Sequence, residues 1–126
     1  MYHHTITLNN GVNIPQLGLG TWFIEDAKAA DAVKAAVQLG YRHIDTAQAY
    51  GNERGVGEGV RTCGVPREEL FVVSKVAAEH KSYALAKAGI DETLKKMGLD
   101  YLDMMIIHSP QPWVEVNQSE NRYVEG

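Results

Sequence analysis

The sequence predicts an α/β fold in which a short β-hairpin precedes parallel strands joined by helices. Short apolar segments alternate along the chain with amphipathic helical segments, which is the pattern of βαβ units and a parallel sheet. These units recur about every 30 residues, the usual length of one βαβ unit. Before the first unit, two short alternating segments flank residues 9–11, Asn-Asn-Gly, which suit a tight hairpin turn.

The hairpin is expected over residues 5–14. Its strands are the alternating segments 5–8 and 12–14, and Gly11 tolerates the positive φ that the turn between them needs. Pro15 has no N–H to donate, so we expect it to end the ladder.

The parallel units are expected over residues 16–112, followed by an irregular polar tail over 113–126. Gly40 and Gly98 follow helical segments and suit helix ends. Apolar runs and helical periodicity place strands at about 17–20, 41–46, 70–74 and 102–107, and helices at about 26–39, 53–61 and 82–97.

The pattern also predicts which faces are buried. The last strand, 102–107, is apolar at nearly every position, as strands buried on both faces are. A four-stranded parallel sheet by itself would leave two open edges, and nothing in the sequence blunts them. Part of the sheet is therefore expected to be missing. The third helix places four residues on one apolar face, namely Ala86, Ile90, Leu94 and Met97.

Composition narrows the class of protein. The formal net charge of −4 argues against a nucleic-acid footprint, because that needs a clustered basic face. No apolar run approaches the roughly 20 residues that span a bilayer, and the N-terminus lacks the pattern of a signal peptide. The single cysteine, Cys63, excludes an internal disulfide and fits a reducing compartment. We expect a cytoplasmic protein without nucleic-acid or membrane partners.

Four residues with acid–base chemistry fall near the C-terminal ends of the predicted strands. Asp45 ends the second strand, and Tyr50 follows it after one short loop. Lys75 comes directly after the third strand and His108 directly after the fourth. In a parallel barrel these strand ends meet at one mouth, where such enzymes keep their chemistry. We therefore expect the four side chains to lie close together.

The four side chains together suit protonation of an oxygen as hydride reaches the adjacent carbon. A tyrosine hydroxyl is ordinarily a weak acid at neutral pH, and a nearby ammonium stabilises the phenolate. Lys75 would supply that charge, Asp45 would hold it by a salt bridge, and His108 would donate to a substrate carbonyl. Taken singly, each residue is more often a cap, a surface charge, a turn residue or a half-buried aromatic. Only the joint pattern favours a catalytic set.

At this point the chain resembles the aldo-keto reductase family, over nearly its whole length to about residue 112. The segments that carry the resemblance are Leu17-Gly18-Leu19-Gly20-Thr21-Trp22, Gly40-Tyr41-Arg42-His43-Ile44-Asp45-Thr46-Ala47 with Tyr50-Gly51-Asn52-Glu53, Arg67-Glu68-Glu69-Leu70-Phe71-Val72-Val73-Ser74-Lys75, and Leu94-Lys95-Lys96-Met97-Gly98-Leu99-Asp100-Tyr101-Leu102-Asp103 with Ile106-Ile107-His108-Ser109-Pro110.

The resemblance implies the N-terminal half of a (β/α)8 TIM barrel with an N-terminal β-hairpin cap, the C-terminal half being absent from the sequence. It implies reduction of aldehydes or ketones to alcohols with hydride from NADPH. Tyr50 would be the general acid, Asp45 and Lys75 would tune it, and His108 would orient the carbonyl substrate.

The resemblance also implies where the ligands lie. The nicotinamide of NADPH would lie across the barrel mouth, near Gly20, Thr21, Trp22 and Asp45. The basic residues that favour NADPH over NADH would lie in the absent half. The residues expected to line the substrate pocket are Trp22, Tyr50, His108 and Trp113.

The chain departs from the family in two small residues and in length. Ala77 and Ser109 stand where many members carry large aromatic residues, which indicates a roomier pocket mouth. A full barrel needs about 250 residues or more, so this chain is either a truncated product or part of a longer sequence. A molecule that ended at residue 126 is expected not to bind NADPH by itself.

Three functions remain open from the sequence: an NADPH-dependent reductase, a non-enzymatic cofactor-binding regulatory protein, and a catalytically dead half-barrel that self-associates. No metal site is expected, because His3, His4 and His80 lack partners at metal-ligand spacing. Glycines at 55, 57 and 59 look suited to phosphate binding, but they lie inside a predicted helix, which favours close packing.

Overall fold

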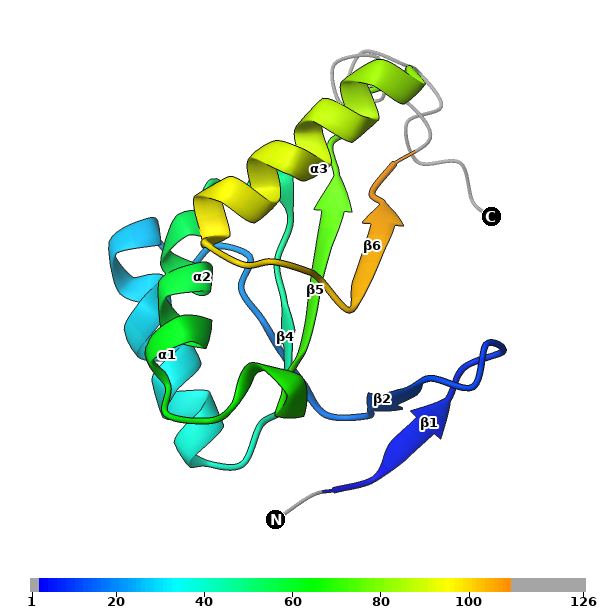
Figure 1. Ribbon diagram of the computed structural model, residues 1–126. Helices are drawn as coiled ribbons and strands as arrows, with labels where there is room; N and C mark the ends of the chain where they lie inside the picture. The colour runs from blue at the N-terminus through cyan, green and yellow to red at the C-terminus, as the bar shows by residue number, and fades with distance from the viewer. Residues whose placement is uncertain (1–2, 110–126) are drawn as a thin grey trace, which may run out of the picture.

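The computed structural model describes residues 3–109 and confirms the α/β architecture, with one antiparallel pair and one parallel sheet (Figure 1). The strands are β1 (Thr5–Thr7) and β2 (Asn13–Pro15) in the antiparallel pair, and β3 (Gly18–Gly20), β4 (His43–Asp45), β5 (Phe71–Val76) and β6 (Met104–Ile107) in the parallel sheet, in that order. The helices are α1 (Asp26–Gln38), α2 (Glu53–Thr62) and α3 (Tyr83–Met97), with 3-10 turns η1 (Gln48–Tyr50) and η2 (Arg67–Glu69).

The register of the parallel sheet places the C-terminal strand ends at one edge. Gly20 pairs with Asp45, Asp45 pairs with Val73, and Val73 pairs with Met104. In Figure 1 the three helices lie on one side of this sheet, and the β1–β2 hairpin lies near the opposite, N-terminal ends of the strands. The sheet edge at the arrowheads is therefore left for the loops that carry the site.

The hairpin turn forms as expected, with Gly11 at a φ of 85°. The ladder extends one residue further than expected, because Pro15 belongs to β2 and pairs with Thr5. Pro15 is the last residue of β2, so the expectation that it would end the ladder is confirmed. The next residue, Gln16, donates its N–H to the His4 carbonyl at 3.0 Å.

The glycines of α2 confirm the interpretation of close packing. A Cβ at Gly55 would lie 2.2 Å from the Asp26 carbonyl oxygen, and one at Gly59 would lie 2.6 Å from the Val33 Cβ, both on α1. A Cβ at Gly57 would lie 2.3 Å from the Met97 backbone at the end of α3. At these positions α2 contacts both other helices where only a glycine hydrogen fits. The three helices therefore pack closely as one layer against the sheet.

The buried face of α3 overlaps the predicted one at Met97, but it is shifted toward Gly89 and Thr93. Its fully buried residues are Gly89, Thr93 and Met97, whereas Ile90 and Leu94 are only half-buried. A Cβ at Gly89 would lie 2.6 Å from the His80 ring, and Thr93 accepts a hydrogen bond from Gln48. The small residues of α3 thus let neighbouring side chains approach, which hydrophobicity alone does not reveal. Gly98 ends the helix at a φ of 66°, as expected.

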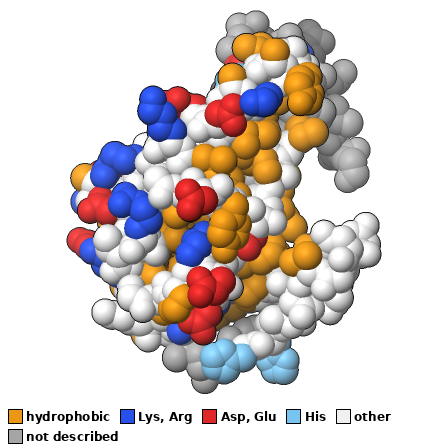
Figure 2. Space-filling view, viewed as in Figure 1, with side chains coloured by type: hydrophobic (Ala, Val, Ile, Leu, Met, Phe, Trp, Pro, Cys, Tyr) orange, Lys and Arg blue, Asp and Glu red, His pale blue; other side chains and the backbone are white. Residues whose placement is uncertain are grey.

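The strand β6 is more exposed than its apolar sequence predicted. Ile106 is 39% exposed and Ile107 is 77% exposed, so the expectation of burial on both faces was wrong for this strand. β6 pairs only with β5 within residues 3–109, which leaves its other edge open. Figure 2 shows hydrophobic side chains gathered along the hollowed side of the molecule.

The core lies between the helices and β4–β5. Within the described residues, no helix is long and apolar enough to cross a membrane. The expected tail over 113–126, including Trp113, lies outside these residues. The core side chains are Ala29, Val33, Val37, Ile44, Val56, Val60, Leu70, Val72 and Met97.

Candidate active site

The predicted acid–base residues gather at the C-terminal edge of the sheet. Asp45 is the last residue of β4, and His108 directly follows β6. Lys75 was expected just after its strand but lies within β5, opposite Ile106 of β6. Lys75 still lies at the C-terminal end of its strand, because β5 ends at the next residue.

The Lys75 ammonium connects three groups of the site. Nζ donates to Asp45 Oδ2 at 2.7 Å, to the Thr46 carbonyl at 2.9 Å and to the Tyr50 hydroxyl oxygen at 3.3 Å. The Lys75 side chain is only 13% exposed, and that of Asp45 is 31% exposed. A sheltered ammonium needs such partners, because burial without them is costly. These contacts point the Lys75 side chain at the phenol oxygen.

The direction of the Lys75–Tyr50 hydrogen bond fixes the role of the phenol proton. An ammonium has no lone pair, so the Tyr50 oxygen is the acceptor. The hydroxyl hydrogen of Tyr50 is therefore free to donate in another direction. The ammonium also lies 4.9 Å from the centre of the tyrosine ring.

Tyr50 is positioned by the turn that links β4 to α2. Ala47 is completely buried and accepts the Tyr50 N–H at 3.1 Å. Gly51 follows at a φ of 69° and ends η1, which a residue with a Cβ adopts only at a cost. The buried alanine and the left-handed glycine together hold the tyrosine at the edge of the sheet.

Two further rings surround Tyr50. The His108 ring meets it edge-on, with centroids 5.7 Å apart, and the Trp22 indole lies nearly parallel to it, with centroids 6.4 Å apart. His108 is exposed, and its backbone N–H donates to the Val76 carbonyl at 3.3 Å. The structure thus brings together all four predicted catalytic residues and one predicted wall of the substrate pocket.

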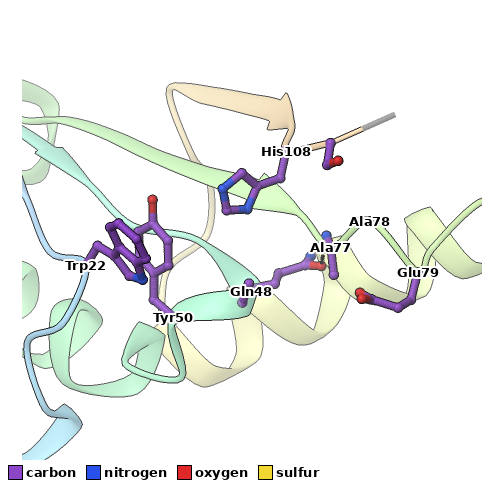
Figure 3. Close-up of a pocket in the computed structure, with 9 residues that line it drawn as sticks. Trp22, Gln48, Tyr50, Ala77, Ala78, Glu79 and His108 are labelled. Atoms are coloured by element: carbon purple, nitrogen blue, oxygen red, sulfur yellow. Dashed lines mark hydrogen bonds between the residues drawn. The ribbon is translucent and has the colours of Figure 1, made fainter. Parts of the chain in front are cut away.

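A cavity of about 870 Å³ opens over these rings (Figure 3). Trp22, Tyr50 and His108 line one part of it, while Ala77 and Ser109 line another. The two small residues that depart from the family pattern therefore face the cavity, in agreement with a roomy mouth. Figure 3 shows Trp22 and Tyr50 side by side, and Ala77 and Ala78 at a distance from them.

The residues expected near the nicotinamide lie in a row beside Asp45. Gly20 pairs with Asp45, and a Cβ built there would meet nothing within 4 Å. Thr21 is completely buried, and both its N–H and its hydroxyl donate to the Asp45 carbonyl. Thr21 thus holds the strand ends together, whereas Gly20 and Trp22 present open surface.

Sequence reasoning missed Gln48 as part of the site. Its side-chain oxygen accepts the Ala77 N–H at 2.8 Å, and its Nε2 donates to the Thr93 hydroxyl at 3.2 Å. Gln48 thereby ties the turn of Tyr50 to the end of β5 and to α3, and Figure 3 shows it reaching toward Ala77. A lone glutamine in a loop carries no periodic or motif signal that would reveal this.

The buried Asn52 was quoted only as part of a motif, but it links three segments. Its amide nitrogen donates to the carbonyls of Thr21 and Ile24 at 2.8 and 3.0 Å. Its oxygen accepts the Thr46 hydroxyl at 2.8 Å. The loop after β3 and the end of β4 are therefore fastened to the first turn of α2.

Comparison with known proteins identifies relatives of this chain. A 9,11-endoperoxide prostaglandin H2 reductase of Trypanosoma cruzi is 48% identical over 109 residues, which are 86% of this chain and 38% of the relative. A glycerol 2-dehydrogenase (NADP(+)) of Saccharomyces cerevisiae is 46% identical over a segment that covers 83% of this chain and 33% of the yeast protein. A crystal structure of an aldo/keto reductase from Brucella melitensis matches with a TM-score of 0.84 at 44% identity, over 86% of this chain and 42% of that one.

The chain thus spans about a third to two fifths of the length of these proteins. Its parallel strands and helices form part of a (β/α)8 TIM barrel, as the sequence predicted. The model of the aldo/keto reductase family matches residues 16–125. The chain therefore belongs to the aldo/keto reductase family.

Proposed function

We propose that this chain forms the acid–base part of an NADPH-dependent reductase that converts aldehydes or ketones to alcohols, with Tyr50 as the general acid. One observation carries the proposal: the Lys75 ammonium donates to the Tyr50 oxygen while it is held by Asp45. Such an arrangement stabilises the phenolate that remains after the proton leaves. The phenol hydrogen stays available to an oxygen in the cavity.

The residues beside Asp45 suit the nicotinamide end of the cofactor. Gly20 leaves open space above its backbone, and Trp22 is 65% exposed next to it. A flat ring can approach the strand ends there without displacing a side chain. NADPH, when bound, supplies the hydride. The name of the yeast relative, which includes NADP(+), supports this choice of cofactor.

The chain's own side chains account for binding and protonation. His108 stands edge-on to Tyr50 and is placed to donate to a carbonyl oxygen lying between the two. Tyr50 then transfers its proton to that oxygen, which becomes the alcohol. Lys75 stabilises the resulting phenolate, and Asp45 keeps the ammonium in place. Trp22 lines the cavity beside Tyr50 and offers an apolar surface to the substrate.

Replacing Tyr50 by phenylalanine tests the proposal directly. The measurement uses a protein in which these residues are joined to the rest of the barrel. The ring contacts survive in Tyr50→Phe but the proton donor is lost, so NADPH-dependent reduction of an aromatic aldehyde should fall by about 10²–10⁴-fold. NADPH binding, followed by cofactor fluorescence, should change little. Tyr83→Phe is the matched control, because Tyr83 is 84% exposed on α3. Full turnover in Tyr50→Phe would overturn the assignment, and binding without turnover in the unmodified protein would favour a regulatory role.

A second candidate behaviour is self-association through β6. Ile107 is 77% exposed and Ile106 is 39% exposed on a strand with one open edge in the described part of the chain. Exposed apolar strand edges pair readily with other chains. Sedimentation velocity of the 126-residue chain should show species above the monomer, and Ile107→Lys should shift them toward monomer. A monomer at every concentration would contradict this candidate.

A further inference from the structure

The loop after β3 holds a bulky residue in a backbone conformation that normally requires glycine. Phe23 has a φ of 65° and is the only non-glycine residue with positive φ within residues 3–109. The Ile24 N–H donates to the Thr21 carbonyl at 3.1 Å, which closes a four-residue turn with Phe23 in its third position. Turns with positive φ at that position strongly prefer glycine. For a phenylalanine this is a genuine outlier.

The surroundings impose this conformation on the turn. Asn52, which is completely buried, donates to the carbonyls of both Thr21 and Ile24. These two acceptors bracket Phe23, so its backbone cannot relax without breaking buried hydrogen bonds. Strained residues that persist in this way are concentrated at functional sites.

Burial does not explain the choice of phenylalanine, because its side chain is 85% exposed. Its ring contact is instead with Trp22, at 4.3 Å between centroids and an angle of 23°. Trp22 in turn lines the cavity and lies 6.4 Å from the Tyr50 ring. Phe23 therefore stacks on the indole that borders the candidate active site.

We propose that Phe23 is a specificity-determining residue, and that Trp22 and Phe23 form an aromatic wall selecting carbonyl compounds with a flat aromatic body. The proposal rests on the proposed function. Stacking on Phe23 fixes the indole before a ligand arrives, so less freedom is lost on binding. Small side chains at Ala77 and Ala78 line the same cavity and leave room for a ring.

The test uses binding rather than turnover. In the 126-residue chain carrying Trp113→Phe, Trp22 is the only tryptophan, so its emission reports on the aromatic wall. The ligands are benzyl alcohol and cyclohexylmethanol, which are unreactive product analogues that differ in having an aromatic or a saturated ring. We expect the unmodified wall to prefer benzyl alcohol, and Phe23→Gly to reduce that preference by about 2- to 10-fold, the range of one aromatic pair.

Two matched variants separate the ring from the backbone. Phe23→Leu keeps the strained turn and apolar bulk but lacks the ring, so it should lose the preference as Phe23→Gly does. Phe23→Tyr should retain it. Phe23→Gly should also make Trp22 more accessible to acrylamide without lowering the thermal midpoint, since glycine relieves the strain.

The outcomes distinguish this proposal from the reductase itself. An unchanged ligand preference in Phe23→Gly, or a preference absent from the unmodified wall, would overturn the role of Phe23. A lower thermal midpoint in Phe23→Gly would also overturn it, because the ring would then serve stability. If the preference shifts as expected but a protein that joins these residues to the rest of the barrel reduces no carbonyl compound with NADPH, the proposed function fails while the aromatic wall stands.

Discussion

β5 and β6 are neighbouring, largely apolar strands, yet they lie in different surroundings. β5 pairs with β4 on one side and β6 on the other, and all of its residues except Lys75 are buried. β6 has only β5 beside it within the described chain, and Ile106 and Ile107 are exposed. In Figure 1 the helices α1 and α2 lie to the left of β5, whereas β6 stands to its right, on the side away from them. Burial here is thus decided by neighbours and not by hydrophobicity.

Because the two strands differ in burial, one part of the candidate site is supported by the core and the other part is not. Lys75, Asp45 and Tyr50 depend on β4, β5 and the turn between β4 and α2, which the core supports. His108 extends from β6 and is exposed. The proposed acid–base pair is therefore built into the part of the sheet that packs against the core, while the residue proposed to orient substrate belongs to the edge of the sheet.

The largest expected difference in stability comes from shortening one apolar side chain in β5 and one in β6. Val72→Ala in β5 removes two methyl groups from a completely buried side chain and should lower the free energy of unfolding by about 2–3 kcal/mol. Ile107→Ala in β6 removes more carbon but from an exposed position, so its effect should stay within about 0.5 kcal/mol. Urea unfolding followed by far-UV circular dichroism measures both.

Equal losses from the two substitutions would contradict this comparison, because Ile107 would then be covered in solution. Repeating the Ile107→Ala measurement over a range of chain concentrations identifies self-association as the cause. A cost that grows with concentration would show that another copy covers β6.

Gln48→Ala should have the next largest effect, because it detaches the end of β5. The Ala77 N–H loses its acceptor and Thr93 loses a donor, which should cost about 1–2 kcal/mol of unfolding free energy. Gln48→Glu keeps the acceptor for Ala77 but not the donor to Thr93, so it should cost less. If Gln48→Ala is as stable as the unmodified chain, the bridge does not anchor β5.

The smallest effect concerns Asp26, at the junction of α1 and α2 behind the sheet. Burial opposes its ionisation, but hydrogen bonds from the Arg54 side chain and the Gly55 N–H outweigh it, so the pKa of Asp26 lies below its ordinary value. A lowered pKa adds stability above the unfolded pKa of about 4, which is lost as the pH falls through the folded pKa. Asp26→Asn should therefore cost under about 1 kcal/mol at neutral pH.

The pH dependence checks the Asp26 prediction. The difference in urea midpoint between the unmodified chain and Asp26→Asn should shrink as the pH falls from 6 to 2.5. A constant difference would indicate that the amide disturbs packing and that the charge contributes nothing.

Much of the fold was predictable because local chemistry and tertiary structure agree. Gly11, Gly40 and Gly98 end or turn the chain where the sequence placed them, and the strand–helix alternation gave the sheet order. The faces were harder to predict. α3 buries Gly89 and Thr93 because small residues allow close approach, which a hydrophobic pattern does not record.

The candidate site was predictable where residues follow strands and less so where they act through hydrogen bonds. Asp45, Lys75 and His108 were placed by strand periodicity and by resemblance to a family. Gln48 went unnoticed because its partners lie 29 and 45 residues away in sequence. The positive φ of Phe23 went unnoticed because it is imposed by a distant amide, against the local preference of the residue.

That amide, on Asn52, has a consequence for the chemical durability of the protein. Its nitrogen donates one proton to the carbonyl oxygen of Thr21 and the other to that of Ile24. Hydrolysis of the amide to an acid would leave a negatively charged oxygen facing both carbonyls in a buried position, so attraction would turn into repulsion. A change of one functional group would then release the loop after β3, whereas the Thr46 hydroxyl at the end of β4 would keep its acceptor.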